Sequence, residues 1–270
     1  MSRLRVEKTL KLYVGGAFVR GESGRTIPVK SHRGEPMHVS RASRKDLRET
    51  VEKMRAAQPG WWKRTAYNRG QILYRLAEML EDREASLPTS PDDVSAAVDR
   101  AVHHAGWTDK ITALLSTLNP VATTYVNYSM VVPTGIVVAV PHPEDGLLGM
   151  VEATCAALVM GNAVALLVPP ERAELAVAYA EALATSDVPA GIVNVLTGDL
   201  EDLVGGANTH DDVDCLYAAS GALGPSLLTK VESEAAHMMR RVVQVPRAAE
   251  PASPLTLGRL SEVRTVWMSA

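Results

Sequence analysis

The feature that most constrains the fold is an alternation of short apolar runs and helical segments in the second half of the chain. Runs rich in β-branched and other apolar residues cover residues 136–140, 163–168, 192–196 and 214–218. Stretches with helical periodicity lie between them, at residues 147–160, 171–184 and 201–207. Parallel neighbours in a sheet need crossover connections of this length, which are usually helices. The sequence therefore predicts an α/β fold, a Rossmann-like parallel sheet with helices on both faces.

The first half of the chain is expected to add helices and small β elements to this sheet. A hairpin is predicted over residues 12–20, with its turn at Gly15-Gly16, and a polar loop over residues 21–43. Ser43 is a suitable N-cap for a first helix, which Pro59-Gly60 is expected to end. The remaining predictions are a helix over residues 66–87, a third helix from Asp92 or Asp93, a strand or hairpin over residues 121–132, a helix over residues 226–239 and an apolar run at residues 242–245.

Composition argues against several classes of protein. The formal net charge is −3, so there is no basic excess for nucleic-acid phosphates. Two cysteines are too few for a disulfide framework and favour a reducing, cytoplasmic location. Residues 1–11 lack the apolar stretch of a signal peptide. The apolar stretch over residues 147–168 contains Glu152 and is divided by Gly161-Asn162, which indicates a buried helix and strand rather than a membrane span.

Side chains that could carry chemistry are few, and simple structural roles explain most of them. His103 and His104 are adjacent on a helix, so they point about 100° apart and are expected on its surface rather than on one metal ion. Cys155 lies in the most apolar helix, and Cys215 begins a strand after two aspartates. Both thiols are expected to be buried and unreactive. No phosphate-binding glycine motif and no nucleophile elbow occurs in the sequence.

Seven short phrases follow one another in a fixed order between residues 12 and 214. They occupy residues 12–20, 68–83, 105–110, 133–141, 157–168, 188–199 and 210–214. The third reads AGWTDK and the fourth reads PTGIVVAVP. In this order the phrases resemble the aldehyde dehydrogenase superfamily. That resemblance implies NAD(P)-dependent oxidation of an aldehyde, by attack of a cysteine thiolate and release of the acid by a glutamate-activated water.

The resemblance implies a cofactor site at the carboxyl ends of the strands, formed by Pro141, Glu171, Gly198 and Ser220. Glu171 matches the family's acidic ribose ligand, but Val168 stands where the family has a lysine. The phosphate loop of the family, at residues 218–223 here, is altered at most positions. Binding of NAD or NADP is therefore expected to be weak or lost.

The catalytic residues of the family have no counterparts at the matching positions. Pro143 replaces the asparagine that stabilises the oxyanion, and no carboxylate occurs near Gln244, where the family has its general base. No cysteine follows Ser220, although the family's nucleophile lies beyond that point. No catalytic residue and no metal ligand is therefore assigned.

Family members are about twice as long as this chain, and the difference is expected to be internal. Residues 1–246 correspond to the NAD(P)-binding domain, with an oligomerisation hairpin near residues 121–134. Residues 247–258 read as a Pro-rich linker. Residues 259–270 resemble the family's C-terminal oligomerisation strand, here expected to be isolated and to seek a partner.

Three functions remain open at this point. The first is a non-catalytic structural or regulatory subunit that pairs with a full-length aldehyde dehydrogenase or with itself, with no nucleic-acid or membrane partner. The second is an NAD(P)-binding subunit that oxidises aldehydes only when a partner supplies the nucleophile. The third is an autonomous enzyme that uses Cys155 or Cys215.

Overall fold

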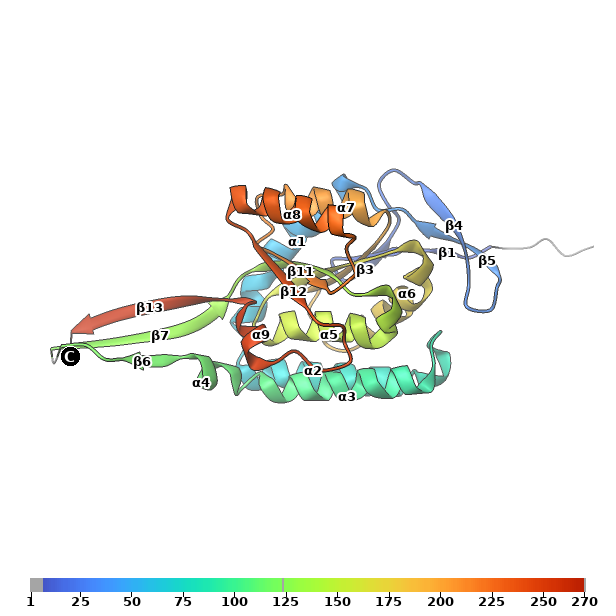
Figure 1. The fold of residues 1–270 in the computed structure, drawn as a ribbon. Coiled ribbons are helices and arrows are strands. Elements are labelled where there is room, and N and C mark those ends of the chain that lie inside the picture. The colour runs from blue at the N-terminus through green and yellow to red at the C-terminus, as the bar shows by residue number, and fades with distance from the viewer. Residues whose placement is uncertain (1–6, 123, 270) are drawn as a thin grey trace, which may run out of the picture.

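The computed structural model describes residues 7–122 and 124–269 (Figure 1). Parts of three predictions lie outside these ranges: the start of the domain at residues 1–6, one residue of the hairpin near 121–134, and the last residue of the strand at 259–270. Within the described residues, the main sheet has seven strands in the order β12-β11-β8-β9-β10-β2-β3.

Five strands of this sheet are parallel, which confirms the predicted α/β fold. They are β8 (Ile136–Val140), β9 (Ala163–Val168), β10 (Val193–Thr197), β11 (Cys215–Ala219) and β12 (Arg241–Val245). The predicted hairpin, β2 (Leu12–Val14) and β3 (Ala17–Val19), adds antiparallel strands beyond β10. The chain runs from β8 through β9 to β10 and then returns to place β11 on the other side of β8. The strand order thus reverses between β8 and β11.

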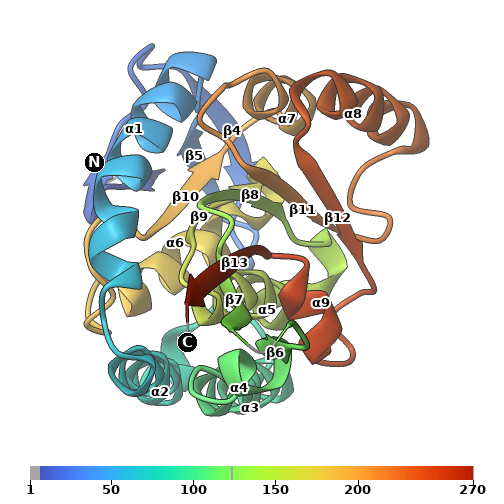
Figure 2. The same cartoon turned by 90° about the vertical axis from the view of Figure 1, so that its left-hand side faces the viewer.

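Helices cover both faces of the sheet (Figure 2). On one face lie α1 (Arg44–Trp62), α7 (Leu200–Asn208) and α8 (Pro225–Met238). On the other lie α5 (Gly146–Val159) and α6 (Ala173–Leu183), which follow β8 and β9. Helices α2 (Ala66–Glu81) and α3 (Pro91–Trp107) form an outer layer against α5 and α6. Helix α5 is therefore enclosed between the sheet and α3.

Helix α1 begins where the sequence predicts but ends later. The Ser43 hydroxyl accepts the amide of Asp46, and the Asp46 carboxylate accepts the amide of Ser43, which forms a capping box. The expectation that Pro59-Gly60 ends the helix is wrong, because α1 continues to Trp62 with Pro59 inside it. The indole of Trp61 is fully buried and donates to the carbonyl of Leu158 in α5. This tertiary contact stabilises the last turn despite the missing proline amide.

Other boundaries also differ from the sequence-based expectations. Helix α2 ends at Glu81, and a short 3-10 helix, Glu84–Ser86, fills the rest of the predicted segment. Helix α3 is capped by Ser90, with Pro91 in the first turn, so it begins before Asp92.

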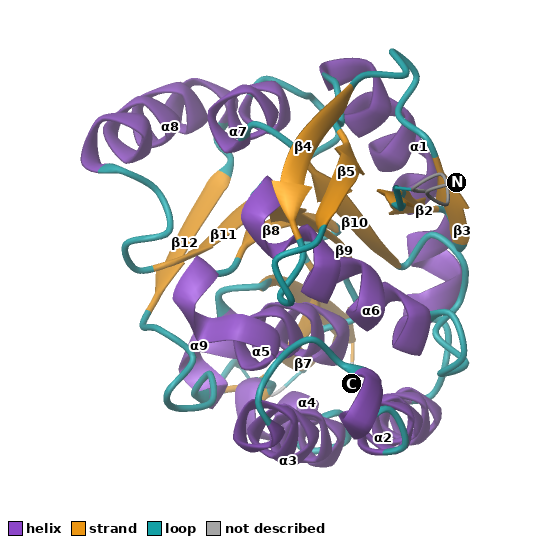
Figure 3. Cartoon of the chain, turned by 90° about the vertical axis from the view of Figure 1, so that its right-hand side faces the viewer, coloured by secondary structure: helices purple, strands orange, loops and turns teal. Residues whose placement is uncertain are grey.

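The predicted loop at residues 21–43 is wrong, because it contains a β-hairpin. Strands β4 (Thr26–Lys30) and β5 (Pro36–Ser40) pair with each other, and β1 (Thr9–Leu10) pairs with β5. This small sheet packs against α6, where Met37 and Val39 contact Val177 (Figure 3). Apolar residues do alternate in these strands, Ile27 with Val29 and Met37 with Val39, but the prolines and the surrounding polar residues led to the prediction of a loop.

A three-stranded antiparallel sheet projects from the body of the protein (Figure 1). It consists of β6 (Thr117–Asn119), β7 (Tyr125–Pro133) and β13 (Ser261–Ser269), and we call it the arm. A short helix, α4 (Ile111–Leu115), leads into it. The expectation of an isolated C-terminal strand is wrong, because β13 pairs with β7 along its whole length, from Ser261↔Pro133 to Ser269↔Tyr125. The outer edge of β13 has no neighbour among the described residues.

The apolar stretch at residues 147–168 forms α5 and β9, as predicted. Both elements are buried throughout most of their length. Within residues 7–122 and 124–269, no helix is long and apolar enough to span a bilayer.

Candidate functional site

The carboxyl ends of β8 and β11 flank the point where the strand order reverses, which is the usual ligand site of such sheets. Pro141 and His142 follow β8, and Ser220 and Gly221 follow β11. A Cβ atom on Gly221 would lie 3.5 Å from the His142 ring, so the imidazole lies directly over this turn. The turn is tight, because Gly221 has a positive φ of 80°.

Residues 246–253, which we call the strap, cross from the end of β12 onto this region. Arg247 pairs with Glu144 and Asp145 in the 3-10 helix Pro143–Asp145, and the amide of Ala248 donates to Asp145 at 3.0 Å. Pro246 and Ala248 then pack beside Pro141 and leave a space of about 10 Å³. That is about the volume one water molecule needs. The strap therefore closes the crevice at the reversal point.

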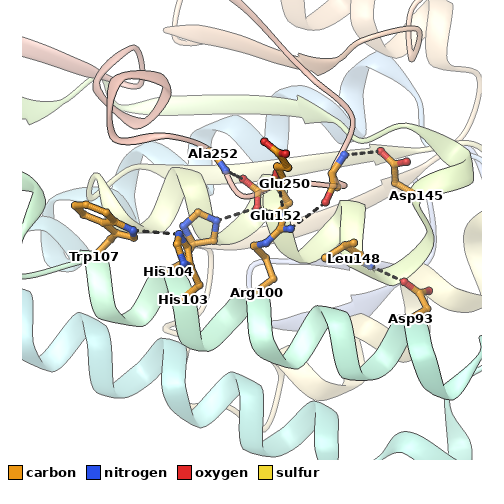
Figure 4. Close-up of polar contacts among 11 residues, drawn as sticks. Asp93, Arg100, His103, His104, Trp107, Asp145, Leu148, Glu152, Glu250 and Ala252 are labelled. Carbon is orange, nitrogen blue, oxygen red and sulfur yellow. Dashed lines mark hydrogen bonds and ion pairs between the residues drawn. The ribbon is translucent and has the colours of Figure 1, made fainter.

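A buried ionic network fixes the second half of the strap (Figure 4). The Glu152 carboxylate, on α5, accepts from Arg100 Nη1 at 2.5 Å and from His104 Nε2 at 3.0 Å. Its other oxygen accepts from the Ala252 amide at 2.9 Å, while Arg100 Nη2 donates to the carbonyl of Ala248 at 3.0 Å. The three charged or ionisable side chains are each at most 8% exposed. We call Arg100, His104 and Glu152 the latch.

Two opposing effects act on the Glu152 carboxylate. Burial raises its pKa, but the hydrogen bond and charge of His104 and the charge of Arg100 lower it more, so the pKa of Glu152 lies below its ordinary value. Glu152 is therefore ionised in the folded protein near neutral pH. An ionised carboxylate only accepts hydrogen bonds, so the facing nitrogen of His104, Nε2, carries a proton.

Helix α5 also begins on a carboxylate supplied by α3. The two oxygens of Asp93 accept the amides of Leu147 and Leu148 at 2.9 and 3.0 Å, and the Thr89 hydroxyl donates to Asp93 at 2.6 Å. These amides belong to the first turn of α5, which follows the first parallel strand, and a helix N-terminus of this kind can bind an anion. Asp93 already fills that position with a negative charge.

The residues expected to bind a cofactor all lie at the carboxyl edge of the sheet. Pro141 is buried after β8, and the Gly198 amide donates to the Val168 carbonyl at 3.3 Å. Glu171 is exposed in the 3-10 helix Pro170–Arg172. The Ser220 amide donates to the Val245 carbonyl at 2.8 Å. The edge thus brings these residues into one row, and their role in binding stays a prediction.

Four features of this edge bear on how a dinucleotide would fit. Strap residues close the reversal point, and Asp93 neutralises the N-terminus of α5. Helix α7 begins on Asp199, with Glu201 and Asp202 in its first turn, which disfavours a phosphate. Helix α8 begins at Gly224 and Pro225 without a side-chain cap or an acidic residue in its first turn, so it offers the most favourable place for an anion along this edge.

Both cysteines are buried and poorly suited to nucleophilic attack, as expected. Cys155 is enclosed in α5 and Cys215 in β11. Burial raises the pKa of the Cys155 thiol well above its ordinary value and that of Cys215 to about 12. Both thiols are therefore protonated at neutral pH.

The sequence-based interpretation overlooked the latch. His104 was expected on a helix surface, but its side chain is fully buried against Glu152. The available signals were Glu152, a charged residue in an apolar helix, and the spacing of Asp93, Arg100 and His104 along one face of α3. Among residues whose placement is described, no group of three or more His, Cys, Asp or Glu side chains could hold a metal ion.

Comparison with known proteins identifies the family. The family model described as "Aldehyde dehydrogenase family" matches residues 18–242, from β3 into β12. The chain belongs to the aldehyde dehydrogenase family. The match ends shortly before the strap begins.

Individual relatives resemble this aldehyde dehydrogenase family member over half of their own length. DhaS of Bacillus subtilis, provisionally named an aldehyde dehydrogenase, is 29% identical over an alignment of 256 positions, which covers 88% of this chain and 50% of DhaS. Aldehyde dehydrogenase [NAD(P)+] 2 of Saccharomyces cerevisiae is 27% identical over an alignment of 245 positions, which covers 84% of this chain and 48% of the yeast protein. The chain therefore spans about half the length of the curated relatives it matches.

Solved structures confirm the fold. The NAD+ complex of an aldehyde dehydrogenase from Bacillus cereus superposes with a TM-score of 0.80 at 21% identity, covering 88% of this chain and 51% of that one. At this identity the likeness establishes the fold alone. It matches the parallel sheet and flanking helices described above.

Proposed function

We propose that this chain is a non-catalytic structural or regulatory subunit of the aldehyde dehydrogenase family, which pairs with a full-length family member or with a second copy of itself. The observation that carries the proposal is the strap. Between β12 and β13 the chain has only residues 246–260, and these pack on Arg100, Asp145 and Glu152. No space for a catalytic domain remains between these two strands.

The absence of suitable nucleophiles supports a non-catalytic role. The two thiols of the described residues are buried, and their raised pKa values keep them protonated. Pro143, which has no side-chain donor, stands where the family resemblance implies an oxyanion-binding asparagine.

The arm supports the pairing role. This sheet projects from the body, and its outer strands β13 and β6 have no further neighbour among the described residues (Figure 1). Exposed apolar side chains lie on it, namely Leu118, Tyr125, Val263, Trp267 and Met268. A free edge with apolar flanks pairs readily with another strand, because the main-chain groups are already aligned. A partner of the same family would supply a matching sheet.

The second candidate function is an NAD(P)-binding subunit that acts with a partner's nucleophile. Its support is the Bacillus cereus relative solved with NAD+ and the uncapped N-terminus of α8 beside Ser220. The closed crevice and Asp93 argue for weak or lost binding. We therefore rank it second.

The experiment that tests the proposal measures aldehyde-dependent reduction of NAD and NADP by the purified chain. We expect no rate above that of a double variant, Cys155→Ala with Cys215→Ala. A calorimetric titration with each dinucleotide is expected to be flat. Thiol-dependent formation of reduced nucleotide would overturn the non-catalytic assignment, and saturable dinucleotide binding without turnover would favour the second candidate.

A further inference from the structure

A cavity of about 430 Å³ lies beneath the strap, between it, β11 and α5. Its volume is within the usual range of small-molecule sites. Val245, Pro246 and Pro251 give it apolar walls, while Glu152, Tyr217 and Glu250 contribute polar groups. It adjoins the small space at the reversal point, with which it shares the lining residues Glu152, Tyr217, Val245 and Pro246.

Tyr217 is the unusual member of this lining. Its side chain is 2% exposed, yet its hydroxyl has no hydrogen-bond partner within the protein. Burial raises the pKa of Tyr217 well above its ordinary value, so the group is a neutral hydroxyl that can donate and accept. A buried hydroxyl without a partner is costly. The Tyr217 hydroxyl has almost no exposed area, so a ligand with a polar head group would satisfy it only with a small shift of the side chain toward the cavity.

The charge around the cavity is negative. Glu152 and Glu250 line it, and Arg247, which also lines it, is paired with Glu144 and Asp145. The remaining guanidinium, of Arg100, is engaged by Glu152. Carboxylates therefore outnumber cationic groups here even if His104 carries a charge. Such a field attracts a cation and repels an anion.

We propose that this cavity binds a small organic cation, a primary amine with a short alkyl chain. The ammonium group would donate to the Tyr217 hydroxyl and to a free lone pair of the Glu152 carboxylate. The alkyl chain would lie against Val245 and the two prolines. This inference stands independently of the proposed pairing and of the fate of the dinucleotide site.

The test is an NMR-monitored titration of the intact chain with butylamine, with 1-butanol and butyrate as matched neutral and anionic probes. We expect saturable shifts from butylamine at residues around the cavity, much weaker ones from butanol and none from butyrate. Because a hydrogen bond to a charged group is lost, Tyr217→Phe should weaken butylamine binding about tenfold.

Two further variants separate binding from folding. Tyr179→Phe is the matched control, because Tyr179 is also a fully buried tyrosine but lies on α6 and does not line the cavity. It should leave butylamine binding unchanged. Glu250→Gln removes an exposed charge and should weaken binding while leaving the melting temperature unchanged. No saturable binding of butylamine, equal binding of butyrate, or equal effects of Tyr217→Phe and Tyr179→Phe would each overturn the proposal.

Discussion

At the scale of single residues, Glu152 is the side chain on which the strap depends most. It is the common partner of Arg100, His104 and the Ala252 amide. Replacing one member of a buried ion pair leaves the other charge uncompensated. We therefore expect Glu152→Gln to lower the free energy of unfolding by about 3 kcal/mol, measured by urea denaturation. Glu250→Gln, an exposed change on the same strap, should stay within about 0.5 kcal/mol of the parent. Equal midpoints for the two variants would contradict a role for the latch.

The same carboxylate makes stability depend on pH. The pKa of Glu152 in the folded protein lies below its ordinary value of 4.5, so the unfolded chain binds this proton more readily. The stabilisation is complete above about pH 4.5 and is lost as the pH falls through the lowered folded-state pKa. Unfolding free energies measured between neutral and acidic pH should fall less steeply in Glu152→Gln than in the parent. Parallel pH curves for the two proteins would show that another carboxyl group is responsible.

Gly146 offers a test of backbone geometry at the start of α5. It has a φ of 57°, and a Cβ atom there would lie 2.4 Å from the Asp93 carboxylate. Gly146→Ala should therefore strain the backbone and displace the Asp93 cap. Together these two effects should lower the free energy of unfolding by more than about 1 kcal/mol. Gly205→Ala in α7 meets nothing within 4 Å and should stabilise by about 0.5–1 kcal/mol. Thermal denaturation gives the melting temperature of each variant. Shifts of the same sign relative to the parent would contradict the described geometry.

At the scale of elements, the docking of α3 on α5 organises the site. Asp93, Arg100 and His104 lie along one face of α3 and contact α5 at its start and middle. Asp93→Ala removes the acceptor for two first-turn amides of α5, and we expect a loss of about 1–2 kcal/mol. Hydrogen exchange should localise the effect to Leu147 and Leu148. Unchanged protection there would mean that the cap does not stabilise α5.

The elements also indicate how far sequence reasoning reaches. The alternation of apolar runs and helices predicted the parallel sheet, because buried strands and amphipathic helices have distinct periods. The hairpin at β4 and β5 was missed although apolar residues alternate in both strands, because the strands are short, each contains a proline, and the flanking segments are polar. Helix α1 passed through Pro59 because Trp61 is anchored by Leu158, 97 residues away. Such long-range contacts leave no local pattern.

In the candidate site too, features with a local sequence pattern could be predicted and features that depend on long-range contacts could not. The strand ends that carry Pro141, Glu171, Gly198 and Ser220 could be located from the sequence. The latch could not, because Glu152 meets Ala252 across 100 residues and Arg100 across 52. Nor could the pairing of β13 with β7, since antiparallel partners far apart in sequence carry no turn signal.

At the scale of the whole molecule, the chain combines about half of an aldehyde dehydrogenase fold with an arm and a strap. Residues 18–242 match the family model, and the strap follows shortly after the end of that match. The arm is an exposed three-stranded sheet with edge strands that could accept another strand. Pairing through this sheet is the central claim of the proposed function.

The most direct measurement is the native mass of the chain, alone and co-expressed with a full-length aldehyde dehydrogenase of the same source, compared with Thr265→Pro. Thr265 lies in the middle of β13 opposite Ser129, and proline cannot donate to a strand partner. We predict a stable oligomer, either mixed or of identical copies, that the substitution disrupts. A parent chain that stays monomeric in both settings would contradict the account.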